Sequence, residues 1–178
     1  MSLRRKFVEL VTAGKRTPRP LQAGDEFKLS REITARVLFP PAIFQGDRAD
    51  DQALVVQLIV SGKSRVLLMS DSGVETERVL LRNYPDLRAE ILIKGQHHSG
   101  VSGSPEFLDR VQPEAIVATS RDFPESERLK VEWTDAVRSR GIKLFRQDET
   151  GAMQLRFFPE RWEATSYVTG ETFRSARR

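Results

Sequence analysis

The 178-residue sequence has no cysteine, only two histidines and 8% aromatic residues. Without cysteine there are no disulfides and no thiolate ligands, so a metal site would have to use histidine and carboxylate side chains. The longest apolar runs, 53–60 and 66–69, are far shorter than the roughly 20 residues of a membrane-spanning helix. The N-terminal stretch lacks the apolar region of a signal peptide, so we expect no export by it, and the sequence leaves the localisation open.

The residues that are present have the balance of a globular protein, with 39% hydrophobic and 30% charged side chains in a length that suits one domain. The formal net charge of +4 belongs to the two ends of the chain. Residues 1–31 hold eight Lys/Arg against three Asp/Glu, and the last five residues hold three arginines. Such an end can attract DNA, although solvated tails are the commoner explanation.

The pattern of apolar residues predicts a hairpin followed by alternating strands and helices. This order is typical of an α/β fold with a mixed β-sheet and flanking helices. No glycine-rich turn links a strand to a helix in the manner of a nucleotide-binding motif. We expect helices over 4–13, 74–83, 105–111 and 125–140, a turn over 148–151, and strands over 33–39, 53–60, 64–70, 90–94, 115–119, 142–145, 153–158 and 162–169.

Asp71 follows the apolar strand 66–69 directly and precedes Gly73 and a predicted helix. Its carboxylate should therefore project from the carboxyl edge of the sheet, where ligands gather in α/β proteins. The alternative is that Asp71 caps the helix that follows, and for this residue alone capping is favoured.

His97 and His98 are the only histidines, and they follow the predicted buried strand 90–94. The chain then opens into a glycine- and serine-rich loop in which Ser99, Gly100 and Ser102 could contact phosphate. Small residues let backbone amides approach a ligand, and hydroxyl groups donate hydrogen bonds to phosphate oxygens. The alternative is a flexible turn that carries two exposed histidines.

The order strand, Asp, helix, strand, His-His, Gly/Ser loop, Pro, helix resembles the C-terminal half of the metallo-β-lactamase-like domain of the competence protein ComEC family. The resemblance covers about residues 25–157. Its matching segments are Asp50-Asp51-Gln52-Ala53-Leu54-Val55, Leu67-Leu68-Met69-Ser70-Asp71, Glu75 or Glu77, Lys94-Gly95-Gln96-His97-His98-Ser99-Gly100, Ser104-Pro105-Glu106-Phe107-Leu108 and Asp148-Glu149-Thr150-Gly151-Ala152.

The resemblance implies half of an αβ/βα sandwich over 25–158, preceded by a basic helix and linker over 1–24 and followed by a strand and basic tail over 159–178. By this resemblance Asp71 bridges a pair of zinc or manganese ions, and His97 or His98 is a ligand of one ion. The other histidine would contact the phosphate or the leaving oxygen. The implied parent is a membrane-attached, metal-dependent phosphodiesterase that acts on DNA during uptake.

Several family features are missing from the chain. The His-x-His-x-Asp-His ligands should precede Asp25 and do not occur, Ser70 replaces a glycine, and Asp122-Phe123-Pro124 stands where many relatives have Gly-His-Pro. Two metal ions need about eight ligand contacts, so we expect an incomplete metal site and a chain that is inactive alone. We also expect exposed apolar surface, which a missing half-domain, a membrane parent or a second copy of the chain would cover. The alternatives are a nucleic-acid or protein interaction module that uses the basic N-terminal arm, and a structural half-domain whose histidines do nothing.

Overall fold

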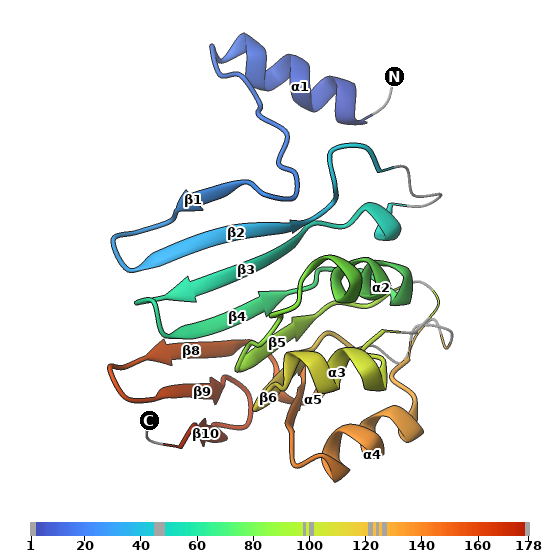
Figure 1. The fold of residues 1–178 in the computed structure, drawn as a ribbon, viewed down its shortest axis with the longest axis vertical. Coiled ribbons are helices and arrows are strands. Elements are labelled where there is room, and N and C mark those ends of the chain that lie inside the picture. Colours follow the sequence, from blue (N-terminus) through green and yellow to red (C-terminus); the bar gives the residue numbers. More distant parts are fainter. Residues whose placement is uncertain are drawn as a thin grey trace.

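The computed structural model describes residues 3–44, 49–97, 99, 102–120, 123, 125 and 128–176 (Figure 1). These residues form an α/β fold with a seven-stranded mixed sheet and a second sheet of three strands, which confirms the expected fold class. The helical elements are α1 (Leu3–Ala13), η1 (Asp50–Gln52), α2 (Val74–Asn83), α3 (Pro105–Val111), α4 (Val131–Ser139) and α5 (Gln147–Thr150). The strands are β1 (Glu26–Lys28), β2 (Ile33–Phe39), β3 (Val55–Val60), β4 (Ser64–Leu68), β5 (Ile91–Lys94), β6 (Ala115–Ala118), β7 (Lys143–Arg146), β8 (Met153–Phe157), β9 (Trp162–Ser166) and β10 (Thr172–Arg174).

The large sheet keeps the order of the sequence, from β1 to β7. Neighbouring strands from β1 to β4 are antiparallel, and those from β4 to β7 are parallel. Parallel neighbours need crossover connections, which α2, α3 and α4 supply. As a result the start of β3 and the carboxyl ends of β4, β5, β6 and β7 all lie at one edge of the sheet, called here the carboxyl edge.

The period-two alternation of the central strands separates two apolar cores. One core lies between the large sheet and the helices, and the other lies between the large sheet and the small one. The strand residues of the helix-side core include Leu67, Leu92 and Ile116, and their chain neighbours Val66, Ile91 and Ala115 face the small sheet. Trp162 of β9 is 1% exposed and lies in this second core. Both faces of the parallel strands are thus buried.

The small sheet joins β8, β9 and β10 in the order β10-β9-β8. Strands β8 and β9 were predicted, whereas the three-residue strands β1 and β10 were not, because so short a segment shows no alternation. The boundary expected at residue 158 falls in the turn between β8 and β9, which pair along their length.

Two predicted elements differ in the structure. The helix expected over 125–140 begins only at Val131, after Lys130 in extended conformation. Residues 125–130 contain one apolar side chain, and the apolar positions that bury this helix start later, at Trp133 and Val137. The predicted turn over 148–151 is the one-turn helix α5.

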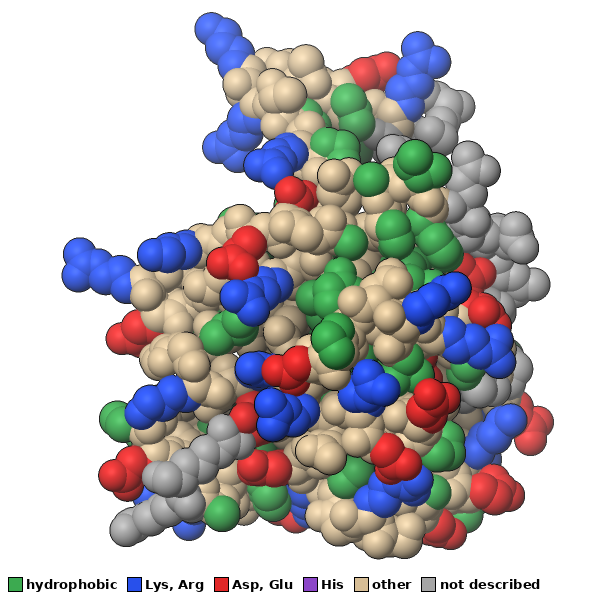
Figure 2. Space-filling model, in the orientation of Figure 1, with side chains coloured by type: hydrophobic (Ala, Val, Ile, Leu, Met, Phe, Trp, Pro, Cys, Tyr) green, Lys and Arg blue, Asp and Glu red, His purple; other side chains and the backbone are tan. Residues whose placement is uncertain are grey.

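Helix α1 stands apart from the two sheets (Figure 1). Its side chains Phe7 and Leu10 are 62% and 65% exposed. On the face shown in Figure 2, hydrophobic side chains gather between α1 and the body of the molecule. The apolar side chains of α1 are thus exposed to solvent, and their cover by a partner stays a prediction. None of the helices in the described part of the chain is long and apolar enough to cross a membrane.

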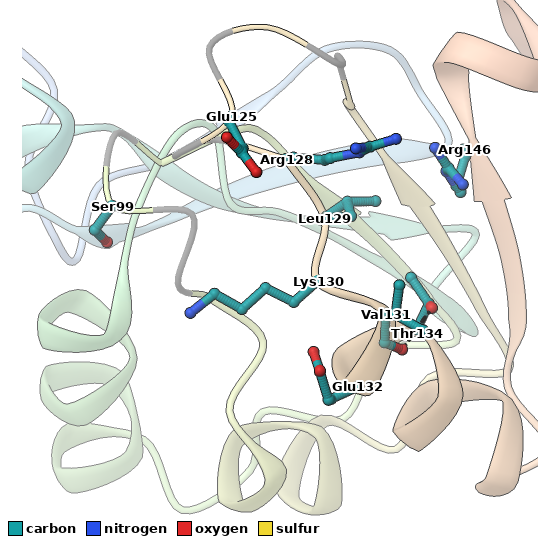
Figure 3. A pocket seen from close by; sticks show the side chains of 9 residues that line it. All are labelled: Ser99, Glu125, Arg128, Leu129, Lys130, Val131, Glu132, Thr134 and Arg146. Atoms are coloured by element: carbon teal, nitrogen blue, oxygen red, sulfur yellow. Dashed lines mark hydrogen bonds between the residues drawn. The ribbon is translucent and has the colours of Figure 1, made fainter.

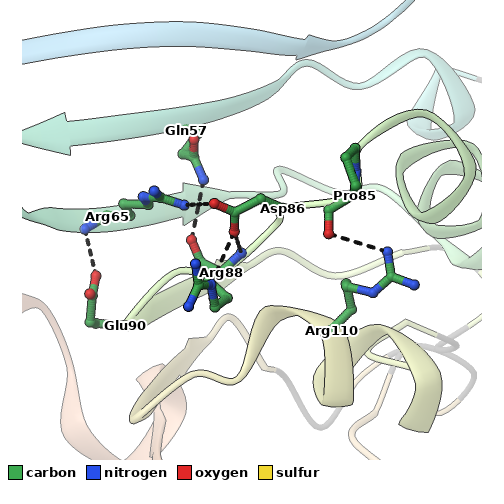
Figure 4. Close-up of polar contacts among 7 residues, drawn as sticks. All are labelled: Gln57, Arg65, Pro85, Asp86, Arg88, Glu90 and Arg110. Carbon is green, nitrogen blue, oxygen red and sulfur yellow. Dashed lines mark hydrogen bonds and ion pairs between the residues drawn. The ribbon is translucent and has the colours of Figure 1, made fainter.

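At the opposite edge of the sheet, Asp86 fixes the connection between α2 and β5 (Figure 4). Its carboxylate accepts hydrogen bonds from the Arg65 guanidinium at 2.8 Å and from Arg88 Nε at 3.2 Å. The Arg65 backbone N–H donates to Glu90 Oε2 at 2.5 Å. The bonds from Arg65 and then Arg88 hold the pKa of Asp86 well below its ordinary value.

We expect Asp86→Asn to lower the free energy of unfolding at pH 7 by ~0.5 kcal/mol, a small effect because the carboxylate is exposed to solvent. Since the folded pKa is lowered, the stabilisation exists above the unfolded pKa near 3.8 and is lost as the pH falls through the folded pKa. Urea unfolding of both proteins from pH 7 down to pH 3 tests this. A stability difference that stays constant over the range would contradict it.

Candidate metal and phosphate site at the carboxyl edge

Three polar side chains reach the carboxyl edge from neighbouring strands. Asp71 follows β4, His97 follows β5, and Asp51 in η1 precedes β3. Because β3 is antiparallel to β4, the start of β3 lies beside the end of β4. The topology therefore brings two predicted residues to the same edge and adds Asp51, which belongs to the matching segment 50–55 and is not among the predicted site residues.

Asp71 is bound to the loop after β5 and does not cap α2. Its Oδ1 accepts the backbone N–H of Gln96 at 2.9 Å, while the N-cap of α2 is Gly73. The same loop is tied by the Gly95 N–H, which donates to the Ser70 carbonyl at 2.6 Å. Asp71 thus links the ends of β4 and β5.

Ser70 adopts a left-handed backbone conformation, with φ of 49°. Glycine takes this conformation without strain, which explains a glycine before the aspartate in the family pattern. In this chain the Ser70 hydroxyl donates to the Leu54 carbonyl at 2.7 Å. This bond ties the turn before Asp71 to the start of β3.

His97 is buried, with 7% of its surface exposed, so it is not a histidine of an open turn. Its Nδ1 accepts the backbone N–H of Ser99 at 3.2 Å and lies 2.6 Å from the Ser99 hydroxyl. The proton of the neutral ring therefore belongs on Nε2, which faces Asp51 Oδ1 at 3.4 Å. A metal ion could replace this proton between an imidazole and a carboxylate.

Gly73 makes room for the His97 ring. A Cβ at this position would lie 2.7 Å from His97 Nε2 and 2.8 Å from Cδ2. Real side chains do not approach so closely, so a larger residue at 73 would push the ring away from Asp51. Gly73, two residues after Asp71, thus lets the His97 ring lie beside Asp51.

The donors at this edge fit zinc or manganese in type, but they are few. Imidazole nitrogen suits zinc, and carboxylate oxygen suits both metals. Within the described ranges, no group of three or more His, Asp or Glu side chains is close enough to hold a metal ion. His98 and Gly100 lie outside the described residues. The structure therefore pairs His97 with Asp51 and leaves the roles of Asp71, His97 and His98 as predictions.

The loop predicted to contact phosphate divides into two parts. Ser99 is exposed at the carboxyl edge, where it also lines a cavity. Ser102 is buried, and its hydroxyl has no hydrogen-bond partner among the described residues. Ser99 is thus open to solvent and Ser102 is not, and the contact of either residue with phosphate stays a prediction.

Glu77, in the middle of α2, fixes the far end of this loop. It is 1% exposed, and its carboxylate accepts the backbone N–H groups of Gly103 and Ser104, the latter at 3.0 Å. Ser104 is the N-cap of α3, but its own side chain makes no capping bond. The carboxylate of Glu77 thus holds the two residues that lead into α3 and does not replace the missing cap.

Lys94, the last residue of β5, is 5% exposed. Its ammonium lies 5.0 Å from the centre of the Trp133 ring and donates to the Gly95 carbonyl at 3.3 Å. Burial lowers the pKa of Lys94 to about 8, and the charges of Glu77 and Asp71 limit the fall. A buried cation therefore lies close enough to Asp71 and Glu77 for both of their charges to act on it.

A cavity of about 590 Å³ adjoins the site beside Ser99, with Arg128, Lys130 and Arg146 in its lining (Figure 3). Arg146 is held by Asp148 at 2.6 Å and by Glu149 at 2.7 Å. Burial acts to raise the pKa of Asp148, but its bonds from Ser120 and Arg146 outweigh this and the pKa lies below its ordinary value. The negative charge that compensates Arg146 is thus retained.

No family model matches the sequence. Over 107 residues the chain is 33% identical to the Competence protein ComA of Neisseria gonorrhoeae, a match that covers 60% of this chain and 16% of the relative. Over 142 residues it is 25% identical to the ComE operon protein 3 of Bacillus subtilis strain 168, covering 77% of this chain and 17% of the relative. The chain is therefore related to competence proteins, and it spans about 16–17% of the length of these two.

Proposed function

We propose that this chain is the C-terminal part of a metal-dependent phosphodiesterase domain that acts on DNA during uptake, and that it does not catalyse alone. The observation that carries the proposal is the buried His97 ring, whose Nε2 faces Asp51 at the edge that also carries Asp71. The relation to two competence proteins supports the biological setting.

In this proposal Asp51, Asp71 and His97 each contribute a ligand to a metal pair at the carboxyl edge, and they do not form a complete site by themselves, since no three such side chains among the described residues are close enough to hold an ion. A bound ion would supply a water of lowered pKa and neutralise charge on the phosphate. Ser99 fixes the ring of His97 through Nδ1, so that Nε2 stays directed at Asp51. With His97 as the ligand, His98 takes the other predicted role, the contact to the phosphate or the leaving oxygen.

The remaining ligands would come from a partner. The chain lacks the His-x-His-x-Asp-His motif, so a preceding half-domain or a membrane-attached parent would have to supply it. The exposed Phe7 and Leu10 of α1 offer apolar surface for such a partner, and a second copy of the chain could cover the same surface.

A metal titration tests this role. We expect zinc or manganese to bind the chain weakly, and at a metal concentration 100 times the Kd to raise its free energy of unfolding by about 2.7 kcal/mol. Both effects should disappear in Asp71→Ala and in His97→Ala, and should persist in Glu75→Ala, which removes an exposed carboxylate of α2. Calorimetry and melting curves give the readout.

The outcome that would contradict the proposal is metal binding that is equal in all four proteins, or absent from the unaltered chain. Equal binding would place the metal elsewhere on the surface. If the unaltered chain binds no metal, the carboxyl edge is not a metal site in this chain.

A further inference from the structure

The cavity beside Ser99 opens at the same edge of the sheet as Asp71 and His97. Its volume of about 590 Å³ lies within the size range of small-molecule pockets and is ample for one nucleotide. Ser99 belongs to both places, because its hydroxyl contacts His97 Nδ1 and its side chain also lines the cavity. A chain of nucleotides could therefore continue from the candidate site into the cavity.

Cationic side chains converge on this cavity from the segment before α4 and from β7. Figure 3 shows the Arg128 side chain extending toward Arg146, and Lys130 extending toward the Ser99 side. Arg128 and Lys130 are the more exposed cations of the lining, since the Arg146 side chain is only 24% exposed. An anion that enters the cavity from solvent therefore meets Arg128 and Lys130 first.

The rest of the lining suits one nucleotide of a single strand. Leu129 and Val131 offer apolar contact for a sugar or base. Two carboxylates, Glu125 and Glu132, also line the cavity, so it is not a general anion-binding site. The same segment carries Phe123, which is 83% exposed and provides a surface on which a base could stack.

We propose that this cavity binds the nucleotide adjoining the scissile phosphodiester of single-stranded DNA. Arg128 and Lys130, which extend in different directions, contact the phosphates on its two sides, and Leu129 packs against its sugar or base. The placement next to a reacting phosphate rests on the proposed function, whereas the binding of DNA by the cavity does not need a metal.

The experiment measures binding of a short, fluorescein-labelled oligothymidylate by anisotropy, in EDTA and over a range of salt concentrations. We expect Arg128→Gln/Lys130→Gln to weaken binding by about tenfold or more. The slope of log K against log salt should become shallower by ~1.4, since each phosphate contact on a single strand contributes about 0.7.

Two double variants of the same charge serve as controls. Arg82→Gln/Arg138→Gln removes exposed arginines from α2 and α4, and Lys15→Gln/Arg16→Gln removes cations from the N-terminal arm. Each should change the affinity by less than about threefold. A loss of affinity in the arm variant alone that equals or exceeds the loss in Arg128→Gln/Lys130→Gln would overturn the proposal and place DNA binding on the arm. Equal losses of affinity in all three double variants would also overturn it, because binding would then depend on net charge alone.

Binding by Arg128→Gln/Lys130→Gln equal to that of the unaltered chain, or no binding by the unaltered chain, would also overturn the proposal. Because EDTA removes metal, this result is independent of the zinc and manganese titration. A negative result for DNA binding leaves the metal proposal standing, and a negative metal titration leaves DNA binding by the cavity standing.

Discussion

Replacing Gly95 by alanine is expected to lower the free energy of unfolding by about 3 kcal/mol, a cost typical of overpacking at a rigid contact. An added Cβ would overlap Asp71 Oδ1 and the Ser70 carbonyl, whose carbon would lie 2.7 Å away. The side chain of Asp71 can rotate, but Ser70 is held in place, because its carbonyl accepts the Gly95 N–H and its hydroxyl donates to the Leu54 carbonyl. The ends of β4 and β5 would have to separate. Urea unfolding gives the measurement.

Gly14→Ala is the matched control for this substitution. Gly14 follows α1, its φ is not positive, and an added Cβ would meet only backbone oxygens, the nearest at 3.3 Å. We expect a change of about 0.5 kcal/mol or less there. If Gly95→Ala proves no more costly than Gly14→Ala, Asp71 is not held against the β5 loop as described.

Glu77→Ala should have a comparable effect, lowering the free energy of unfolding by about 3 kcal/mol. The substitution leaves two backbone N–H groups, those of Gly103 and Ser104, without their acceptor. It also removes the carboxylate whose charge helps to keep the buried Lys94 protonated. Buried donors and charges that lose a partner account for many of the largest single-residue losses of stability.

Glu75→Ala tests whether burial, and not helix charge, causes this loss. Glu75 lies two residues earlier on α2, is exposed, and pairs with Arg78 on the surface. Its removal should cost about 0.5 kcal/mol or less. Denaturation curves that shift equally for the two variants would show that Glu77 does not fix the loop after His97.

The sequence carried enough information to predict the elements whose signals are local. Helices α2 and α3 begin and end at the predicted residues, because apolar spacing marks both and Ser104-Pro105 marks the start of α3. The central strands follow from their alternation, and the strand-end rule placed Asp71 and His97 at one edge. These features depend on a few consecutive residues.

The remaining features depend on residues far apart in the chain. Asp51 meets His97 across 46 positions, and Glu77 meets Gly103 across 26. Neither contact leaves a periodic trace in the sequence, and the close approach at Gly73 becomes visible only once the ring of His97 is placed. The late start of α4 is local, but the Glu, Arg, Leu and Lys residues before Val131 favour a helix by propensity, so propensity alone places the start too early.

X-ray absorption at the zinc edge tests most directly whether His97 and its neighbouring carboxylates hold a metal ion. For the zinc-loaded chain we predict nitrogen and oxygen ligands at about 2.0–2.1 Å, with the scattering pattern of one imidazole. That pattern should be lost in His97→Ala and retained in His98→Ala. An imidazole signal lost only in His98→Ala would move the ligand to His98, and a spectrum unchanged by both substitutions would contradict a metal site at this edge.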